Sequence, residues 1–199
     1  FFNSRFANDI FPYSNKLNMG LCGIKGMTYS KELTDQCDLL ISLGCRFAPT
    51  LCNGNPKKFA KQAYTISVNN DKNELDLNLK KIDLKINHNL NYFLEKFEKF
   101  IQNKKVNSYN KWVKECLIIK NNNKIPNLKS KKHPIDLYRF MHDLGNLAPK
   151  DSILITDAGS NYYIGGQAWN FNKGQKEISS SANAAMGLSL PLSIGASVA

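Results

Sequence analysis

Residues 38–44 read Asp38-Leu-Leu-Ile-Ser-Leu-Gly44 and indicate the fold class. The run is short, apolar on both faces and closed by glycine, which is typical of a buried parallel strand. Two further strands fit the runs at 64–68 and 82–86, and the segments around them have helical spacing. Strands that alternate with helices predict an α/β domain with a parallel sheet over residues 1–105.

The composition changes after residue 103 to a stretch rich in Asn, Lys and Ser, which predicts a linker over residues 106–132. Pro134 then stands where a helix can begin. The apolar run at 152–156 predicts a strand that enters a Gly-Ser turn and a helix, and another strand, a loop of small residues and a final apolar helix follow. We therefore expect a second α/β domain over residues 133–199. The predicted class is α/β, with parallel sheets flanked by helices in two incomplete doubly wound domains.

Composition and charge narrow the class of protein. Hydrophobic residues make up 42% of the chain and charged residues 22%, as in ordinary globular proteins. No segment has the roughly 18 apolar residues that a membrane-spanning helix needs, and the first residues lack the pattern of a signal peptide. The net charge is +11, but the lysines are spread along the chain and the densest run, 129–132, lies in the predicted linker. We expect a cytoplasmic protein with no nucleic-acid partner and no membrane partner. The alternative of a basic nucleic-acid binder rests on the net charge alone.

The spacing of the five cysteines predicts that they have structural roles. No pair has the Cys-x-x-Cys spacing of a zinc site, and Cys37 and Cys45 flank the first apolar run. They are predicted to be buried thiols in a reducing compartment.

The segment Asp157 to Asn161 is the first candidate for a binding site. It follows a predicted strand and opens a predicted helix, and backbone N–H groups at a helix start bind anions such as phosphate. The alternative is a plain tight turn with an Asp or Ser helix cap. Met186, which lies among small residues, could contact a planar ligand or simply fill the core.

Several segments resemble the thiamine-diphosphate enzymes of the acetolactate synthase type. Residues 37–47 read CDLLISLGCRF, against DLLIALGARF in that family. Residues 184–199 read AAMGLSLPLSIGASVA, against GAMGFGLPAAIGASVA. Gly20 to Gly26 and Thr156-Asp-Ala-Gly-Ser160 are similar to the family's central glycine loop and to the opening of its diphosphate-binding domain. The resemblance runs through most of the chain.

The resemblance implies a set of cofactor contacts. In the family, the diphosphate and pyrimidine of thiamine diphosphate lie against the two C-terminal segments, and the side chain matching Met186 supports the bent cofactor. Positions 184 and 189 are glycine in the family and are Ala184 and Ser189 here. Gly26 and Arg46 match a region that lines FAD in acetolactate synthases, and the alternative is a scaffold domain without flavin. The implied cofactor-binding residues are Ala158, Gly159, Ser160, Asn161, Ala184 and Met186.

The implied activity is decarboxylation of a 2-oxo acid such as pyruvate and transfer to a second carbonyl, in a homodimer or homotetramer. The family's activating Glu would precede Phe1, and its Mg²⁺ ligands, a Gly-Asp-Gly followed by an Asn, would follow Ala199. We therefore expect the chain to be part of a longer enzyme, with no catalytic residue and no metal ligand among these 199 residues. The alternative is a non-catalytic nucleotide-binding or regulatory module that retains the fold.

Overall fold

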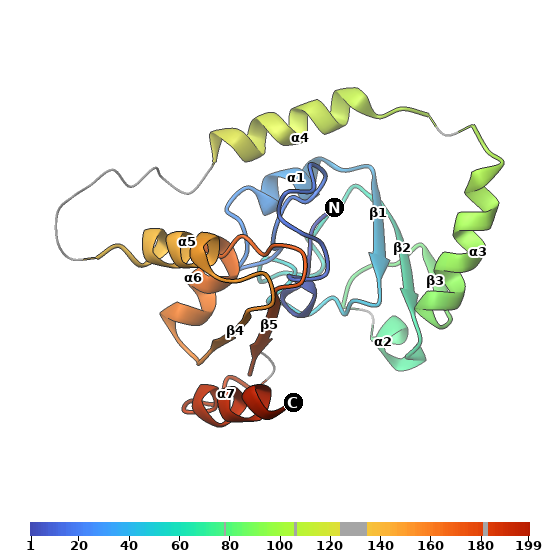
Figure 1. Cartoon of the computed structure of the whole chain (residues 1–199). Helices are drawn as coiled ribbons and strands as arrows, with labels where there is room; N and C mark the ends of the chain where they lie inside the picture. The colour runs from blue at the N-terminus through green and yellow to red at the C-terminus, as the bar shows by residue number, and fades with distance from the viewer. Residues whose placement is uncertain (78, 106, 124–134, 181–182) are drawn as a thin grey trace. The chain divides into compact units, whose positions relative to one another are not determined.

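The computed structural model describes residues 1–77, 79–105, 107–123, 135–180 and 183–199 (Figure 1). Its contacts form two compact units. One comprises Lys31–Ile118, and the other comprises Phe1–Ser30 together with Ile119–Ala199. The predicted domain boundaries at 105 and 133 stay a prediction, because a compact unit of this chain need not be a domain of the whole protein. The lysine run at 129–132 and Pro134 lie outside the described residues.

The unit Lys31–Ile118 is built on a three-stranded parallel sheet in the order β1-β2-β3 (Figure 1). Ile66 in the middle strand pairs with Ile41 on one side and Leu84 on the other. Helices α2 and α3 pack on β2, and the side chains of Asp71 and Asn89 cap their first turns. The elements of residues 30–122 are α1 (Ser30–Gln36), β1 (Leu39–Leu43), β2 (Tyr64–Asn69), α2 (Lys72–Asp76), β3 (Leu84–Asn87), α3 (Leu90–Gln102) and α4 (Asn110–Asn122). The first residue of α1 and the last turn of α4, from Ile119 on, belong to the other unit.

The burial of β1 corrects a prediction. Leu39, Ile41 and Leu43 point to one face of the strand and are 42–48% exposed, whereas Ser42 on the other face is buried. The main helix contacts of this sheet are made with β2 and β3, and within the described residues that apolar face of β1 is open to solvent. An apolar run indicates which residues can be buried, but it does not indicate which face a neighbouring element covers.

The second unit contains a two-stranded parallel sheet, formed by β4 (Ile153–Thr156) and β5 (Lys176–Ser179) (Figure 1). Its other elements are the 3-10 turn η1 (Arg5–Ala7) and the helices α5 (Leu137–Leu147), α6 (Ser160–Ala168) and α7 (Ser189–Val198). The prediction of an α/β fold with parallel sheets flanked by helices is confirmed. Helix α5 begins after Asp136, three residues beyond the predicted start, because the Asp136 side chain accepts a hydrogen bond from Arg139 N at 3.0 Å.

Helices α5 and α6 approach closely over the core of this unit. A Cβ atom on Gly145 would lie 3.1 Å from Trp169, and one on Gly165 would lie 2.9 Å from Met141 Cε. The core is formed by Met141, Leu154, Ala168, Trp169 and Phe171. Gln175, 1% exposed, lies beside it and accepts a hydrogen bond from Trp169 Nε1 at 3.2 Å. This packing holds β4 and the start of α6 in place.

Two further observations concern the cysteines and membranes. Cys52 and Cys116 are buried, but Cys37 and Cys45 are only half-buried. The prediction that Cys37 and Cys45 are buried is therefore wrong. None of the helices described is long and apolar enough to span a membrane.

Candidate functional site

The carboxyl ends of β4 and β5 bring two loops to one edge of the small sheet. Thr156, the last residue of β4, pairs with Ser179, the last residue of β5. The loop that leads from β4 into α6 and the loop that leads from β5 toward α7 therefore start side by side. Ligands of open α/β sheets bind at the carboxyl ends of the strands, so this edge is the candidate site.

The first loop leaves backbone N–H groups open at the start of α6. Gly159 is the N-cap residue, with φ +127° and ψ −160°, a conformation that strongly favours glycine. Gly159 has no side chain that could cap α6, and in the first turn the Asn161 side chain accepts a hydrogen bond from the N–H of Tyr162 at 2.9 Å. The Asp or Ser cap of the alternative prediction is therefore not found at this N-cap, whereas the choice between a plain turn and a binding site stays a prediction. Ser160 and Asn161 are exposed, so the positive end of α6 can receive an anion.

Asp157 joins the first loop to the second. Its carboxylate accepts hydrogen bonds from Gly187 N at 2.9 and 3.0 Å and from Ser189 Oγ at 3.0 Å. It also accepts from Ala158 N at 2.7 Å. These donors, led by the Ala158 N–H, hold the pKa of the Asp157 carboxyl below its usual value. Asp157 thus binds the loop around residue 187 instead of capping the helix that follows it.

The second loop carries the other two predicted cofactor contacts. Ala184 has φ +48°, and its N–H donates to Ser180 O at 2.7 Å. The side chain of Met186 is 87% exposed, so it is free to contact a ligand at this edge. The structure therefore brings the six predicted cofactor-binding residues to two neighbouring loops.

The weaker candidates for a flavin or nucleotide contact are not among the residues that form that edge. The Gly26 carbonyl accepts a hydrogen bond from Gln167 Nε2 at 3.1 Å, near the end of α6. A Cβ atom on Gly26 would lie 2.4 Å from Leu21 O, so this glycine is required by a tight turn. Arg46 belongs to the other unit, where its guanidinium pairs with Glu74 at 3.2 Å. Both residues thus have a structural explanation.

The residues at the edge fit the diphosphate end of thiamine diphosphate. The open N–H groups of α6 suit a polyanion, and Gly159 leaves room for its close approach. The hydroxyl Oγ1 of Thr156 is buried without a hydrogen-bond partner in the described part of the chain, directly before Asp157. The Thr156 hydroxyl is therefore available as a hydrogen-bond donor to a ligand at the end of β4.

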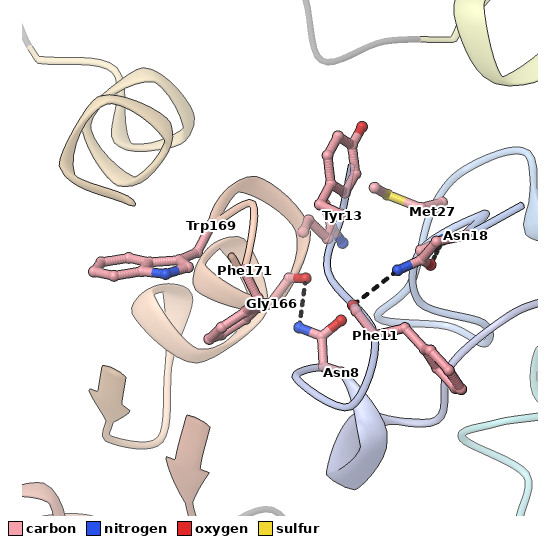
Figure 2. A pocket seen from close by; sticks show the side chains of 10 residues that line it. Asn8, Phe11, Tyr13, Asn18, Met27, Gly166, Trp169 and Phe171 are labelled. Carbon is pink, nitrogen blue, oxygen red and sulfur yellow. Dashed lines mark hydrogen bonds between the residues drawn. The ribbon is translucent and has the colours of Figure 1, made fainter. Parts of the chain in front are cut away.

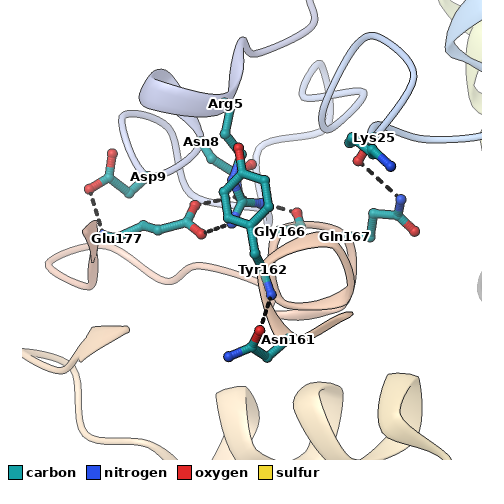
Figure 3. A network of polar contacts seen from close by, with 9 residues as sticks. All are labelled: Arg5, Asn8, Asp9, Lys25, Asn161, Tyr162, Gly166, Gln167 and Glu177. Atoms are coloured by element: carbon teal, nitrogen blue, oxygen red, sulfur yellow. Dashed lines mark hydrogen bonds and ion pairs between the residues drawn. The ribbon is translucent and has the colours of Figure 1, made fainter. Parts of the chain in front are cut away.

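A buried polar network that the sequence did not reveal fixes the first 30 residues to α6 and β5 (Figure 3). The Arg5 guanidinium pairs with the Glu177 carboxylate, and its Cζ lies 4.0 Å from the centre of the Tyr162 ring. Asn8 Nδ2 donates to Gly166 O at 3.2 Å and to Glu177 Oε2 at 3.3 Å. Burial raises the pKa of Glu177, and Arg5 opposes that shift. Since 172 residues separate Arg5 from Glu177, no sequence motif joins them.

A small pocket beside this network is a packing gap (Figure 2). Asn8, Tyr13, Met27 and Trp169 are among its lining residues, and its volume is about 10 Å³. Such a volume holds about one water molecule, so it cannot take a cofactor.

The comparisons with known proteins identify the family. Residues 1–97 match the family model of the thiamine pyrophosphate enzyme central domain. This segment belongs to the thiamine pyrophosphate enzyme family. The matched segment is divided between the two compact units. Residues 1–30 lie in the unit that also contains Ile119–Ala199, and residues 31–97 lie in the unit Lys31–Ile118.

Curated relatives extend the similarity over nearly the whole chain. An acetolactate synthase large subunit of Lactococcus lactis is 28% identical over 189 residues, which is 94% of this chain and 32% of that protein. A probable acetolactate synthase large subunit of Methanocaldococcus jannaschii is 26% identical over 95% of this chain and 32% of its own length. The chloroplastic acetolactate synthase of Arabidopsis thaliana is 26% identical over 95% of this chain and 28% of its own. The chain thus spans about a third of the length of these relatives.

Proposed function

We propose that this chain is part of a thiamine-diphosphate-dependent 2-oxo acid decarboxylase or carboligase similar to acetolactate synthase. The observation that supports this proposal is the edge where Asp157 joins the loop at 158–161 to the loop at 184–189. The two loops contain the residues that the resemblance assigns to the cofactor. The family of residues 1–97 supports the same cofactor.

In this proposal each loop holds a different end of the cofactor. The first N–H groups of α6, at Ser160 and Asn161, hold the diphosphate. The Ala184 backbone and the Met186 side chain contact the thiamine rings. When bound, the cofactor would supply its cationic thiazolium ring as the electron sink for decarboxylation of a 2-oxo acid such as pyruvate. In this proposal the residues of this chain bind and orient the cofactor, and none of them transfers a proton.

We further propose the remaining features of the enzyme from the same resemblance. Mg²⁺ binds the diphosphate through ligands outside these 199 residues. The whole protein is a cytoplasmic homodimer or homotetramer. The central domain serves as a scaffold without FAD; in support, the pair with Glu74 and the tight turn give Arg46 and Gly26 structural roles. Visible absorbance of a bound flavin in the purified protein would contradict this last point.

Binding and turnover in the full-length protein test the proposal. Isothermal titration with thiamine diphosphate and Mg²⁺ should give saturable binding, and pyruvate should be consumed only when both are present. Binding without consumption of a 2-oxo acid supports the alternative of a non-catalytic nucleotide-binding or regulatory module. No binding of thiamine diphosphate overturns the proposal.

A matched pair of variants tests the assignment of the second loop. Met186→Ala removes a side chain that is 87% exposed at the site, so it should weaken thiamine diphosphate binding by roughly tenfold, the effect of about 1.4 kcal/mol. Asn183→Ala changes an exposed side chain of the same loop that the resemblance does not assign to the cofactor, and it should leave the affinity unchanged. Equal affinities in the two variants would remove Met186 from the site.

A further inference from the structure

The loop that carries Met186 is held from both sides by backbone hydrogen bonds. On one side, Ala184 N donates to Ser180 O at 2.7 Å. On the other, Gly187 N donates to both carboxylate oxygens of Asp157, at 2.9 and 3.0 Å. Because the Met186 side chain is 87% exposed, packing does not fix its position. The anchors on either side of it fix the backbone from which the side chain projects.

The anchor at Asp157 has a second part on α7. Ser189 Oγ donates to Asp157 Oδ2 at 3.0 Å, and Ser189 N lies 3.4 Å from the same oxygen. A carboxylate beside the first residue of a helix is also stabilised by the positive end of that helix. Hydrogen bonds to a charged acceptor are stronger than those between neutral groups. Asp157 therefore holds both Gly187 and the start of α7.

Ser189 differs from the family motif GAMGFGLPAAIGASVA, which residues 184–199 resemble. The motif has glycine at this position, and glycine has no side-chain hydroxyl. In this chain the hydroxyl adds a donor to a carboxylate that already accepts from Ala158 N and Gly187 N. The contact therefore spans the 32 positions from the end of β4 to the start of α7.

We propose that Asp157 and Ser189 are positioning residues that hold the 184–187 loop in the conformation that receives the rings of thiamine diphosphate. This inference rests on the proposed function. Asp157 also joins the two ends of the site, because it is adjacent to Ala158 in the diphosphate-binding loop and bonded to Gly187 in the ring-binding loop. The pair thus sets the distance between the groups that hold the two ends of one ligand.

The test compares two probes, thiamine diphosphate and inorganic pyrophosphate, in the full-length protein with Mg²⁺. Pyrophosphate occupies only the end held by α6, whereas thiamine diphosphate also needs the loop around Met186. Ser189→Ala should weaken thiamine diphosphate binding by roughly fivefold and Asp157→Asn by roughly tenfold, with pyrophosphate binding unchanged. The double variant should bind thiamine diphosphate as weakly as Asp157→Asn alone, since both substitutions disrupt the same contact between Asp157 and Ser189.

Two controls separate positioning from general stabilisation. Ser193→Ala also removes a hydroxyl hydrogen bond of α7, from Ser193 Oγ to Ser189 O at 2.8 Å, and it should leave both affinities unchanged. Ser189→Thr keeps a hydroxyl at this position, so its affinity for thiamine diphosphate should be close to that of the original protein.

Each remaining outcome has one meaning. If the original protein binds neither probe, the proposed function fails. If the original protein, Ser189→Ala and Asp157→Asn all bind thiamine diphosphate equally well, the proposed function stands and the positioning role is overturned. A parallel loss of both probes also overturns that role, because it would show that the pair supports the whole edge and not the ring-binding loop.

Discussion

A Cβ atom at residue 166 would lie 1.2 Å from Nη1 of Arg5. The two residues are far apart in the sequence, and the Arg5 guanidinium occupies the space beside α6 that any larger residue at 166 would need (Figure 3). Glycine at this position is therefore required by the buried ion pair of Arg5 with Glu177.

Gly166→Ala should destabilise the unit Phe1–Ser30 with Ile119–Ala199. The added methyl group must displace the guanidinium from its partners, so the free energy of unfolding should fall by about 2 to 3 kcal/mol. Urea unfolding followed by the fluorescence of Trp169, in a Trp112→Phe background, measures the change in this unit.

Gly195→Ala is the matched control for that substitution. Apart from the backbone of α7 itself and the two neighbouring residues, no described atom lies within 4 Å of the place where its Cβ would stand. Alanine is the better helix former, so this variant should gain up to about 1 kcal/mol. Equal effects of the two substitutions would contradict the account of Gly166.

Glu177→Gln should be costly because it leaves the Arg5 charge buried without its counter-ion. The side chains of Arg5 and Glu177 are 13% and 4% exposed. Breaking a buried ion pair by removing one partner costs about 3 kcal/mol. The exposed pair of Lys31 and Asp35 offers a control, since Asp35→Asn should change the free energy of unfolding by less than about 0.5 kcal/mol. A loss below about 1 kcal/mol for Glu177→Gln in urea unfolding would argue against a structural role of the pair.

The strands could be predicted from the sequence because they are short, apolar and bounded by glycine or polar turns. The run at 38–44 became β1, Leu39–Leu43, and the run at 64–68 became β2, Tyr64–Asn69. The start of α5 was predicted less well, because Pro134 is only one of two start signals and the Asp136 side chain caps the helix. Local signals therefore identify an element more reliably than its first residue.

Contacts between distant residues could not be predicted in this way. The loop at 158–161 was indicated by its place between a predicted strand and a predicted helix, and the resemblance to a family assigned it and the loop at 184–186 to one cofactor. Neither signal revealed what holds the two loops together. The bond of Asp157 to Ser189 and the pair of Arg5 with Glu177 depend on the folded arrangement of separate segments. Each partner, taken alone, is an ordinary polar residue of a turn, helix or strand.

Ala184→Gly should stabilise the second loop of the site. Ala184 has φ +48°, a left-handed conformation that costs a residue with a Cβ about 1 to 2 kcal/mol. Glycine relieves that strain but gains freedom in the unfolded chain, so the net gain should be about 0.5 to 1 kcal/mol. The change is measured by urea unfolding.

Ala185→Gly provides the comparison for this loop position. Ala185 is not among the residues with positive φ, so glycine brings no relief there and should destabilise slightly through the unfolded chain. A loss of stability in Ala184→Gly equal to that in Ala185→Gly would contradict the strain at residue 184.

The unit that contains Tyr29 should lose stability at alkaline pH. Tyr29 is 4% exposed, its hydroxyl donates to Met19 O at 3.0 Å, and burial followed by the nearby Tyr13 raises its pKa. The unfolded chain ionises this tyrosine near pH 10, whereas the folded chain does not. The stabilising contribution is therefore complete below about pH 10 and is lost as the pH rises toward the folded-state pKa. Urea unfolding at successive pH values, followed through Trp169, should show this decline.

Tyr29→Phe tests the origin of the decline. The variant loses the hydrogen bond to Met19 O, so at neutral pH the free energy of unfolding should fall by about 1 kcal/mol. It cannot ionise at this position, so its decline above about pH 10 should be shallower; Tyr13, whose pKa burial also raises, accounts for the remaining slope. Tyr109→Phe, at a side chain that is 66% exposed, should leave the slope as it is. An unchanged slope in Tyr29→Phe would show that the alkaline loss has another source, because the group assigned to it would be absent.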